Sequence, residues 1–102
     1  MKRSLRVLHV EDNERDQTLI DRHLSRAGYD LVSERVDTAA ALRAALWAGP
    51  WDVILCDYSM PQFNALEALA LLRDMGQDIP FIIISGTVGE EVAVAAMRAG
   101  AQ

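Results

Sequence analysis

Carboxylate side chains stand at the ends of two apolar stretches of this 102-residue sequence. Glu11 and Asp12 follow the stretch Leu5–Val10, and Asp57 ends the stretch Asp52–Asp57. Carboxylates that are brought close together must either share protons, with raised pKa values, or hold a cation. Oxygen ligands without His or Cys suit a hard ion such as Mg²⁺, which takes one or two carboxylates, keeps several waters and accepts phosphate oxygens. The pattern therefore predicts an acidic site that can accept a phosphoryl group.

Each of these residues has a role that follows from its position. Asp57 is the better nucleophile candidate because it ends the central apolar strand, and an aspartate carboxylate is an established covalent acceptor of phosphoryl groups. Glu11 and Asp12 would anchor the metal. Ser85 follows another apolar stretch, so its hydroxyl could hydrogen-bond a phosphoryl oxygen, and Gly86 leaves room for that group. Taken singly, each residue has a plainer explanation as part of a turn or a helix start.

Four strand-helix units would bring these residues to one place. The expected strands are Leu5–Val10, Leu31–Val36, Asp52–Asp57 and Pro80–Ile84. The expected helices cover about 14–27, 39–48, 65–75 and 90–99, with Asp12 or Asn13, Thr38 and Asn64 as amino-terminal caps. This order predicts an α/β fold, a doubly wound parallel sheet with helices on both faces. In such a sheet the carboxyl ends of the strands meet at one edge, where ligands bind.

Composition and charge narrow the possible functions. Half of the residues are hydrophobic and a quarter are charged, which indicates one globular domain. A net charge of −5 argues against binding of nucleic acid by this domain. The single cysteine, Cys56, lies within an apolar strand and is expected to be a buried, inert thiol, as suits a cytoplasmic protein. No apolar run is long enough for a membrane span, and the amino terminus does not look like a signal peptide.

Three motifs together resemble the receiver domain of bacterial two-component response regulators. They are an acidic pair in Val10–Asn13, an aspartate followed by x-x-Met-Pro in Asp57–Pro61, and a serine after the fourth strand in Ile84–Gly86. The resemblance covers essentially the whole chain. It implies a flavodoxin-like sheet with strand order 2-1-3-4. It also implies that Asp57 is phosphorylated by the phosphohistidine of a sensor histidine kinase or a phosphotransfer protein.

The same resemblance implies a metal site and a switch residue. Mg²⁺ would be held by Asp12, Asp57 and the backbone carbonyl of Ser59, with Glu11 assisting through water. Ser85 would be the switch hydroxyl. The carbonyl ligand and the kinase donor come from the resemblance alone.

Three departures from the family pattern affect these expectations. The family usually carries a lysine at the end of a fifth strand and an aromatic switch residue earlier in that strand, and this sequence ends before either. We therefore expect residues 1–102 to be a single receiver domain that lacks its carboxy-terminal strand and helix, which leaves Phe81–Ile84 as an exposed apolar edge. Ala65 also stands where the family tends to have glycine.

The last expected helix has a second apolar face. Val94 and Met97 lie outside the face that would pack on the sheet, so we expect them to contribute to a partner surface or to a homodimer. Cover by a carboxy-terminal helix is the alternative interpretation.

Four aromatic or imidazole side chains are not assigned to chemistry. His9 lies within the first strand and His23 within a helical stripe, so packing or partial exposure is expected for both. Trp47 and Trp51 flank Gly49–Pro50 and are expected to cover an edge of the core.

Two other classes of function remain open beside the signalling switch. A phosphohydrolase resembling the haloacid dehalogenase family would need a second aspartate two residues after the nucleophile, where this chain has Ser59, so we do not expect an enzyme. The other class is a binding module that is not phosphorylated, which includes a flavodoxin-like flavin binder. No Ser/Thr/Gly-rich loop follows the first strand, where such a binder would need one.

Overall fold

Strands and helices alternate along the chain, as the sequence predicts. The computed structural model describes residues 3–57, 60 and 63–84. The elements are β1 (Arg3–Val10), α1 (Glu14–Arg26), β2 (Tyr29–Val36), α2 (Ala39–Ala48), β3 (Val53–Asp57), α3 (Ala65–Asp74) and β4 (Phe81–Ile84). The helix expected at about 90–99 lies outside the described residues.

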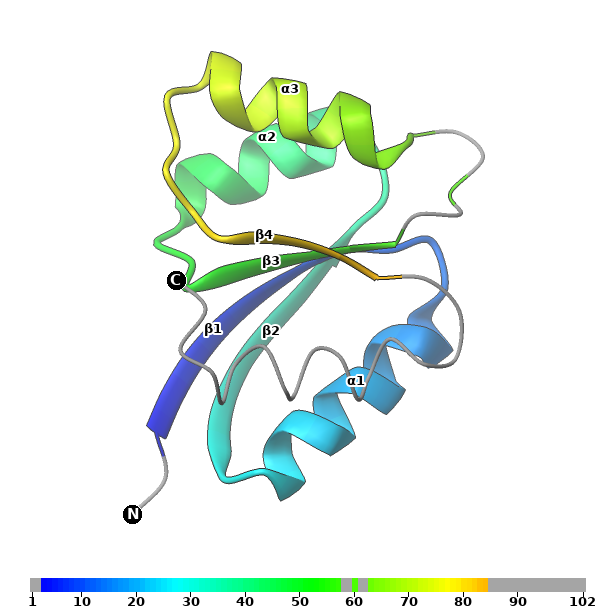
Figure 1. Cartoon of the computed structure of the whole chain (residues 1–102), viewed down its shortest axis with the longest axis vertical. Helices are drawn as coiled ribbons and strands as arrows, with labels where there is room; N and C mark the ends of the chain where they lie inside the picture. The colour runs from blue at the N-terminus through cyan, green and yellow to red at the C-terminus, as the bar shows by residue number, and fades with distance from the viewer. Residues whose placement is uncertain (1–2, 58–59, 61–62, 85–102) are drawn as a thin grey trace.

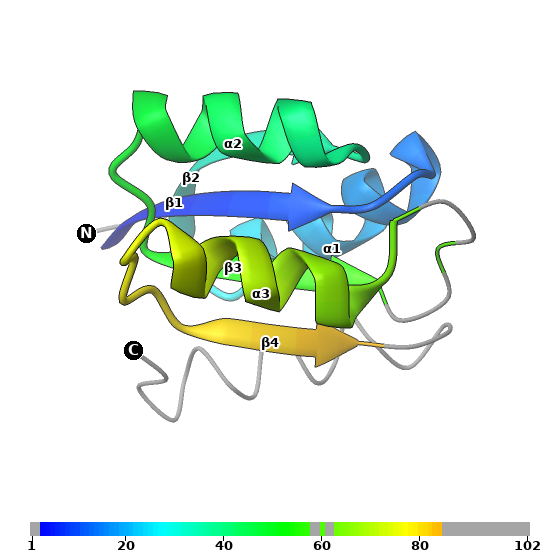
Figure 2. The same cartoon turned by 90° about the horizontal axis from the view of Figure 1, so that it is seen from above.

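The four strands form one parallel sheet in the order β2-β1-β3-β4. Figure 2 shows β1 and β4 pointing the same way, so that their carboxyl ends lie at the same edge of the sheet. β2 is an edge strand with alternating exposed residues, in agreement with the mixed apolar and charged sequence of its predicted range. The fold class and strand order inferred from the sequence are both confirmed.

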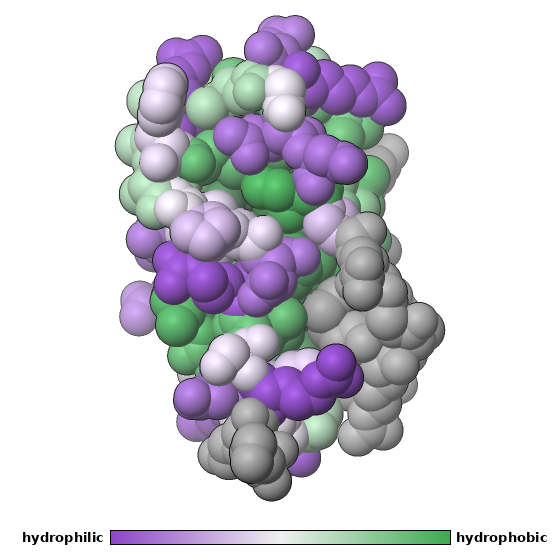
Figure 3. Space-filling model, turned by 90° about the vertical axis from the view of Figure 1, so that its left-hand side faces the viewer, coloured by the Kyte–Doolittle hydropathy of each residue, from purple (hydrophilic) through white to green (hydrophobic). Residues whose placement is uncertain are grey.

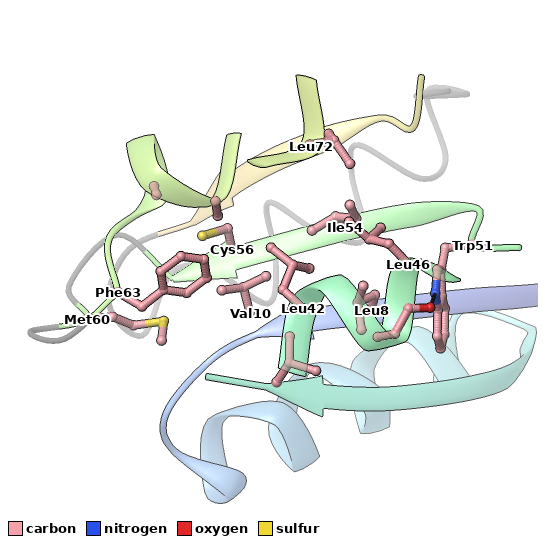
Figure 4. Packing of buried hydrophobic residues seen from close by; sticks show 14 residues of the cluster. Leu8, Val10, Leu42, Leu46, Trp51, Ile54, Cys56, Met60, Phe63 and Leu72 are labelled. Atoms are coloured by element: carbon pink, nitrogen blue, oxygen red, sulfur yellow. Dashed lines mark hydrogen bonds between the residues drawn. The ribbon is translucent and has the colours of Figure 1, made fainter. Parts of the chain in front are cut away.

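Helices cover both faces of this sheet. α2 and α3 lie on one face and α1 lies on the other (Figure 1). Successive residues of β3 alternate between the two cores: Ile54 and Cys56 belong to the cluster beneath α2 and α3 (Figure 4), whereas Val53 and Leu55 belong to the cluster beneath α1. A strand that is buried on both faces needs an unbroken apolar run, because side chains alternate across the sheet. This double burial, which β1 shares, is that of an inner strand of the sheet.

Polar capping residues mark the amino-terminal ends of the three helices, and glycines follow the carboxy-terminal ends of two of them. The side chains of Asn13, Thr38 and Asn64 each accept a hydrogen bond from a backbone N–H in the first turn of α1, α2 and α3, at 2.8, 3.1 and 2.9 Å. Gly28 and Gly76 follow α1 and α3 with φ angles of +105° and +68°. Residues with a side chain rarely adopt this left-handed conformation, so glycine at these two positions stops the helices without strain.

The two tryptophans have different surroundings. Trp51 is buried, its Nε1 donates a hydrogen bond to the carbonyl oxygen of Ala45 at 2.8 Å, and the guanidinium of Arg6 lies 5.2 Å from its ring centroid. Trp47 is 80% exposed, so the expectation that it covers the core was wrong. Ala45 and Leu46 already fill the buried side of α2, and the residue that follows them points into solvent.

Trp51→Phe should lower the free energy of unfolding by about 1–3 kcal/mol, because the indole loses its buried hydrogen bond to the Ala45 carbonyl and the smaller ring leaves part of its site in the core unfilled. Trp47→Phe should change it by less than about 0.5 kcal/mol, as is usual for an exposed site. Urea denaturation of both variants measures the difference. Equal destabilisation by the two substitutions would contradict the assignment of Trp51 to the core.

Polar side chains of α1, β1 and β2 form hydrogen bonds that link the helix to the sheet. His9 is buried, and its Nε2 lies 2.9 Å from Oδ1 of Asp21 in α1. The other carboxylate oxygen of Asp21 accepts a hydrogen bond from the Ser33 hydroxyl of β2 at 2.8 Å. His23 is partly exposed. Both histidines therefore have the structural surroundings that the sequence suggests.

The surface toward the amino ends of the strands mixes hydrophilic and hydrophobic residues without one broad apolar face (Figure 3). Within the described ranges, no helix has both the length and the apolar character that crossing a membrane would require.

Candidate metal centre

Carboxylates from β1 and β3 meet at the carboxyl edge of the sheet. Val10 pairs with Cys56 in the parallel register, so the next residue of each strand, Glu11 and Asp57, reaches the same level. Carboxylate oxygens of Glu11, Asp12 and Asp57 all lie within 4.8 Å of one another. Glu11 is buried, Asp57 is partly exposed and Asp12 is exposed. The acidic cluster therefore has one buried side and one side that is open to solvent.

Backbone hydrogen bonds hold the turn that carries the acidic pair. The N–H of Glu11 donates to the carbonyl oxygen of Val36 at 2.9 Å, which extends the pairing of β1 with β2 by one residue. The N–H of Asn13 donates to Oε2 of Glu11 at 3.2 Å, while the Asn13 side chain caps α1. The position of the Glu11 carboxylate is thus tied both to the sheet and to the start of the helix.

Burial and crowding change the acidity of the cluster. Burial, followed by the negative charge of Asp57, raises the pKa of Glu11 from 4.5 to about 8, although the hydrogen bond from the Asn13 amide acts in the opposite direction. Without a cation, the cluster therefore retains a proton at neutral pH. Burial also raises the pKa of the neighbouring Cys56 thiol to about 12, with a smaller contribution from Asp57 and then Glu11. Cys56 is a protonated and unreactive thiol, as expected from its place in the strand.

The sequence matches the family described as "Response regulator receiver domain" over residues 7–102. The chain belongs to this family. Receiver domains are part of two-component systems, in which they act with histidine kinases or phosphotransfer proteins, and they generally bind Mg²⁺.

Curated and solved relatives agree with this assignment. Transcriptional regulatory protein PrrA of Mycobacterium leprae is 35% identical over 98 residues, which cover 96% of this chain and 41% of the relative. The crystal structure of a response regulator from Hahella chejuensis has a TM-score of 0.70 and 33% identity, and the match covers 96% of this chain and 76% of that one. The chemotaxis response regulator CheY4 of Vibrio cholerae shares the fold, with a TM-score of 0.67 at 23% identity and coverage of 96% and 82%. The receiver domain spans about two fifths of the length of PrrA.

The residues of this receiver domain fit a hard divalent cation. Its acidic cluster offers oxygen ligands from three carboxylates. Ligand oxygens lie about 2.0–2.1 Å from Mg²⁺, so oxygens within 4.8 Å of one another need only small movements to surround one ion. The exposed side, at Asp12, leaves positions for water or for phosphate oxygens.

Five other site residues predicted from the sequence belong to segments next to or beyond the strand ends. Ser59, Ser85, Gly86, Val94 and Met97 lie outside the described residues. The register does pair Asp57 with Ile84, the last described residue of β4, so that strand ends beside the acidic cluster.

Two polar residues at strand ends were not singled out from the sequence. Arg35, near the carboxyl end of β2, donates a hydrogen bond from Nη1 to the backbone carbonyl oxygen of Glu11 at 3.3 Å. Asp52, just before β3, accepts a hydrogen bond from the Arg6 N–H through Oδ2 at 2.8 Å, and its own N–H donates to the Arg6 carbonyl at 2.8 Å. Ligand sites lie at the carboxyl ends of parallel strands, which is the reason that Asp57 was identified. Arg35 stands next to the last residue of β2, so the same reason applies to it.

Proposed function

We propose that this receiver domain is a phosphoacceptor switch, in which Asp57 takes a phosphoryl group from a phosphohistidine in the presence of Mg²⁺. The observation that carries the proposal is the approach of the Glu11, Asp12 and Asp57 carboxylate oxygens to within 4.8 Å of one another. Family membership supports the choice of donor, a sensor histidine kinase or a phosphotransfer protein.

The transfer would be a direct displacement at phosphorus. A carboxylate oxygen of Asp57 attacks the phosphorus atom, the P–N bond to the donor histidine breaks, and its electron pair stays on the imidazole nitrogen. Mg²⁺, when bound, supplies positive charge that offsets the charge of the nucleophile and of the phosphoryl oxygens. Asp12, Asp57 and the Ser59 carbonyl would hold this ion. Glu11, which is buried and joined to the turn by the Asn13 amide, would assist through water.

Phosphorylation would then alter the domain's contacts with its partners. We assign to the Ser85 hydroxyl a hydrogen bond to the new phosphoryl group, with space provided by Gly86. The local charge would bias a two-state change in the surface that includes Val94 and Met97, and this would alter partner binding or self-association. The net charge of −5 favours protein partners over nucleic acid for this domain. We place this exchange with a kinase in the cytoplasm.

Incubation of the intact chain with a small acyl phosphate and Mg²⁺ should add one phosphoryl group per molecule, as measured by intact-protein mass spectrometry. Chelation of Mg²⁺ should prevent the addition, because the crowded carboxylates then repel the incoming phosphate. Inorganic phosphate in place of the acyl phosphate provides the control, since it has no comparable leaving group. A folded chain that gains no phosphoryl group with Mg²⁺ and acyl phosphate present would contradict the proposal.

We propose a switch rather than a turnover enzyme. Support comes from Ser59, which stands where an aspartyl phosphohydrolase of the haloacid dehalogenase type would carry a second aspartate. Continuous release of phosphate from simple phosphomonoesters would favour the enzyme instead.

A further inference from the structure

The end of β2 lies directly beside the acidic turn. Arg35 pairs with His9 and Val36 pairs with Val10 in the parallel register. The pairing continues beyond β1, because the Glu11 N–H donates to the Val36 carbonyl oxygen at 2.9 Å. β2 contributes no carboxylate to the cluster, yet it provides the backbone partner for the first residue of that cluster.

The side chain of Arg35 binds the other backbone polar group of Glu11, its carbonyl oxygen. Its Nη1 donates to the Glu11 carbonyl oxygen at 3.3 Å, and it also lies 3.8 Å from Oδ2 of Asp37. The Arg35 side chain is 30% exposed, so the guanidinium is partly shielded from solvent. The N–H and the carbonyl of Glu11 therefore both have partners on β2.

The orientation of that carbonyl matters for the metal ligand that follows it. The Glu11 carbonyl and the Asp12 N–H belong to one planar peptide unit, so a partner that fixes the first also fixes the second. Asp12 is exposed, and its carboxyl group interacts with that of Glu11, which belongs to the same turn. The Glu11–Asp12 peptide, whose carbonyl accepts from Arg35, therefore sets the direction in which the Asp12 backbone leaves the strand.

We infer that Arg35 is a positioning residue of the acidic site, which orients the Glu11–Asp12 peptide so that the carboxylates converge on a divalent cation. Its effect on phosphorylation rests on the proposed function, whereas its effect on backbone order and cation binding does not. Outer partners that orient metal ligands typically contribute about 10-fold or more to metal affinity.

A purely electrostatic effect of Arg35 would have the opposite sign. A guanidinium close to the cluster repels Mg²⁺, so its removal without any loss of positioning would tighten cation binding. Positioning predicts weaker binding after removal. The sign of the change in Mg²⁺ affinity therefore separates the two explanations.

The test compares Arg35→Ala with Arg35→Lys, which keeps a donor and the charge. Arg43→Ala is the matched control, because Arg43 is an exposed arginine on α2 and its removal changes the net charge equally. Calorimetric titration with Mg²⁺ should show about 10-fold weaker binding for Arg35→Ala, partial recovery for Arg35→Lys and no weakening for Arg43→Ala. Thermal unfolding verifies that all variants are folded.

A second readout needs no metal. The backbone amides of Glu11 and Asn13, which donate to the Val36 carbonyl and to Oε2 of Glu11, should exchange hydrogen faster in Arg35→Ala than in the wild-type chain, with protection restored in Arg35→Lys. Unchanged exchange together with unchanged or tighter Mg²⁺ binding would overturn the inference. If the wild-type chain binds Mg²⁺ but accepts no phosphoryl group, the proposed function fails and the positioning role of Arg35 stands. If it binds no Mg²⁺ at all, the exchange measurement alone decides.

Discussion

Asp57→Asn should abolish phosphorylation by a small acyl phosphate and Mg²⁺, with no phosphoryl group detectable on a chain that remains folded. An amide has no anionic oxygen to attack phosphorus, and the substitution also removes one of the three clustered carboxylates. The change is nearly isosteric, and the side chain is only partly buried, so the fold should tolerate it. Intact-protein mass spectrometry before and after incubation measures the outcome.

The other end of the same strand provides the matched control. Asp52 stands five positions before Asp57 in the sequence, but it binds the backbone of Arg6 at the amino edge of the sheet. Asp52→Asn keeps an oxygen that can accept the Arg6 N–H, so this variant should be phosphorylated as fully as the wild-type chain. A phosphoryl group on Asp57→Asn that hydroxylamine releases would show that another carboxylate is the acceptor.

The stability of the metal-free chain should fall as the pH rises from about 4.5 to about 8. The folded-state pKa of Glu11 is raised above its ordinary value. Its contribution to the free energy of unfolding is therefore fully present below about pH 4.5 and is lost as the pH rises through about 8. One group can change the free energy of unfolding by at most about 1.4 kcal/mol per pH unit. For a chain of this size, each kcal/mol corresponds to about 4–8 °C in Tm. Thermal unfolding in the presence of a chelator measures this slope.

Glu11→Gln isolates the contribution of this one carboxyl group. The glutamine cannot ionise but can still accept the Asn13 N–H, so the variant should lose most of the slope and should exceed the wild-type Tm at pH 8. Glu34→Gln is the control at an exposed position of β2 and should retain the wild-type slope. Equal slopes in the wild-type chain and in Glu11→Gln would be inconsistent with a raised pKa at Glu11.

Mg²⁺ should oppose this loss of stability. A cation that binds the ionised cluster stabilises the folded chain by mass action, so the gain in Tm from Mg²⁺ should increase between pH 5 and pH 8. Removal of Mg²⁺ by a chelator should reverse the gain. A gain in Tm that is independent of pH would place the ion elsewhere.

The strands, helices and acidic cluster could be predicted because the signals for them are local. A continuous apolar run defines β3, polar caps and glycines define the helix ends, and each is set by a few neighbouring residues. The convergence of Glu11, Asp12 and Asp57 follows from one further rule, that parallel strands joined by helices end at the same edge. The sequence by itself thus determined the fold and the chemical character of the site.

The tertiary structure decided the features that depend on what packs around a side chain. Trp47 and Trp51 stand four positions apart on either side of Gly49–Pro50, but Trp51 enters the core whereas Trp47 is exposed. The raised pKa of Glu11 arises from burial and from a carboxylate 46 positions away in the chain. The contact of Arg35 with the Glu11 carbonyl likewise depends on the register of β1 against β2. Burial, charge proximity and register join residues that are distant in sequence, which is why local patterns cannot fix them.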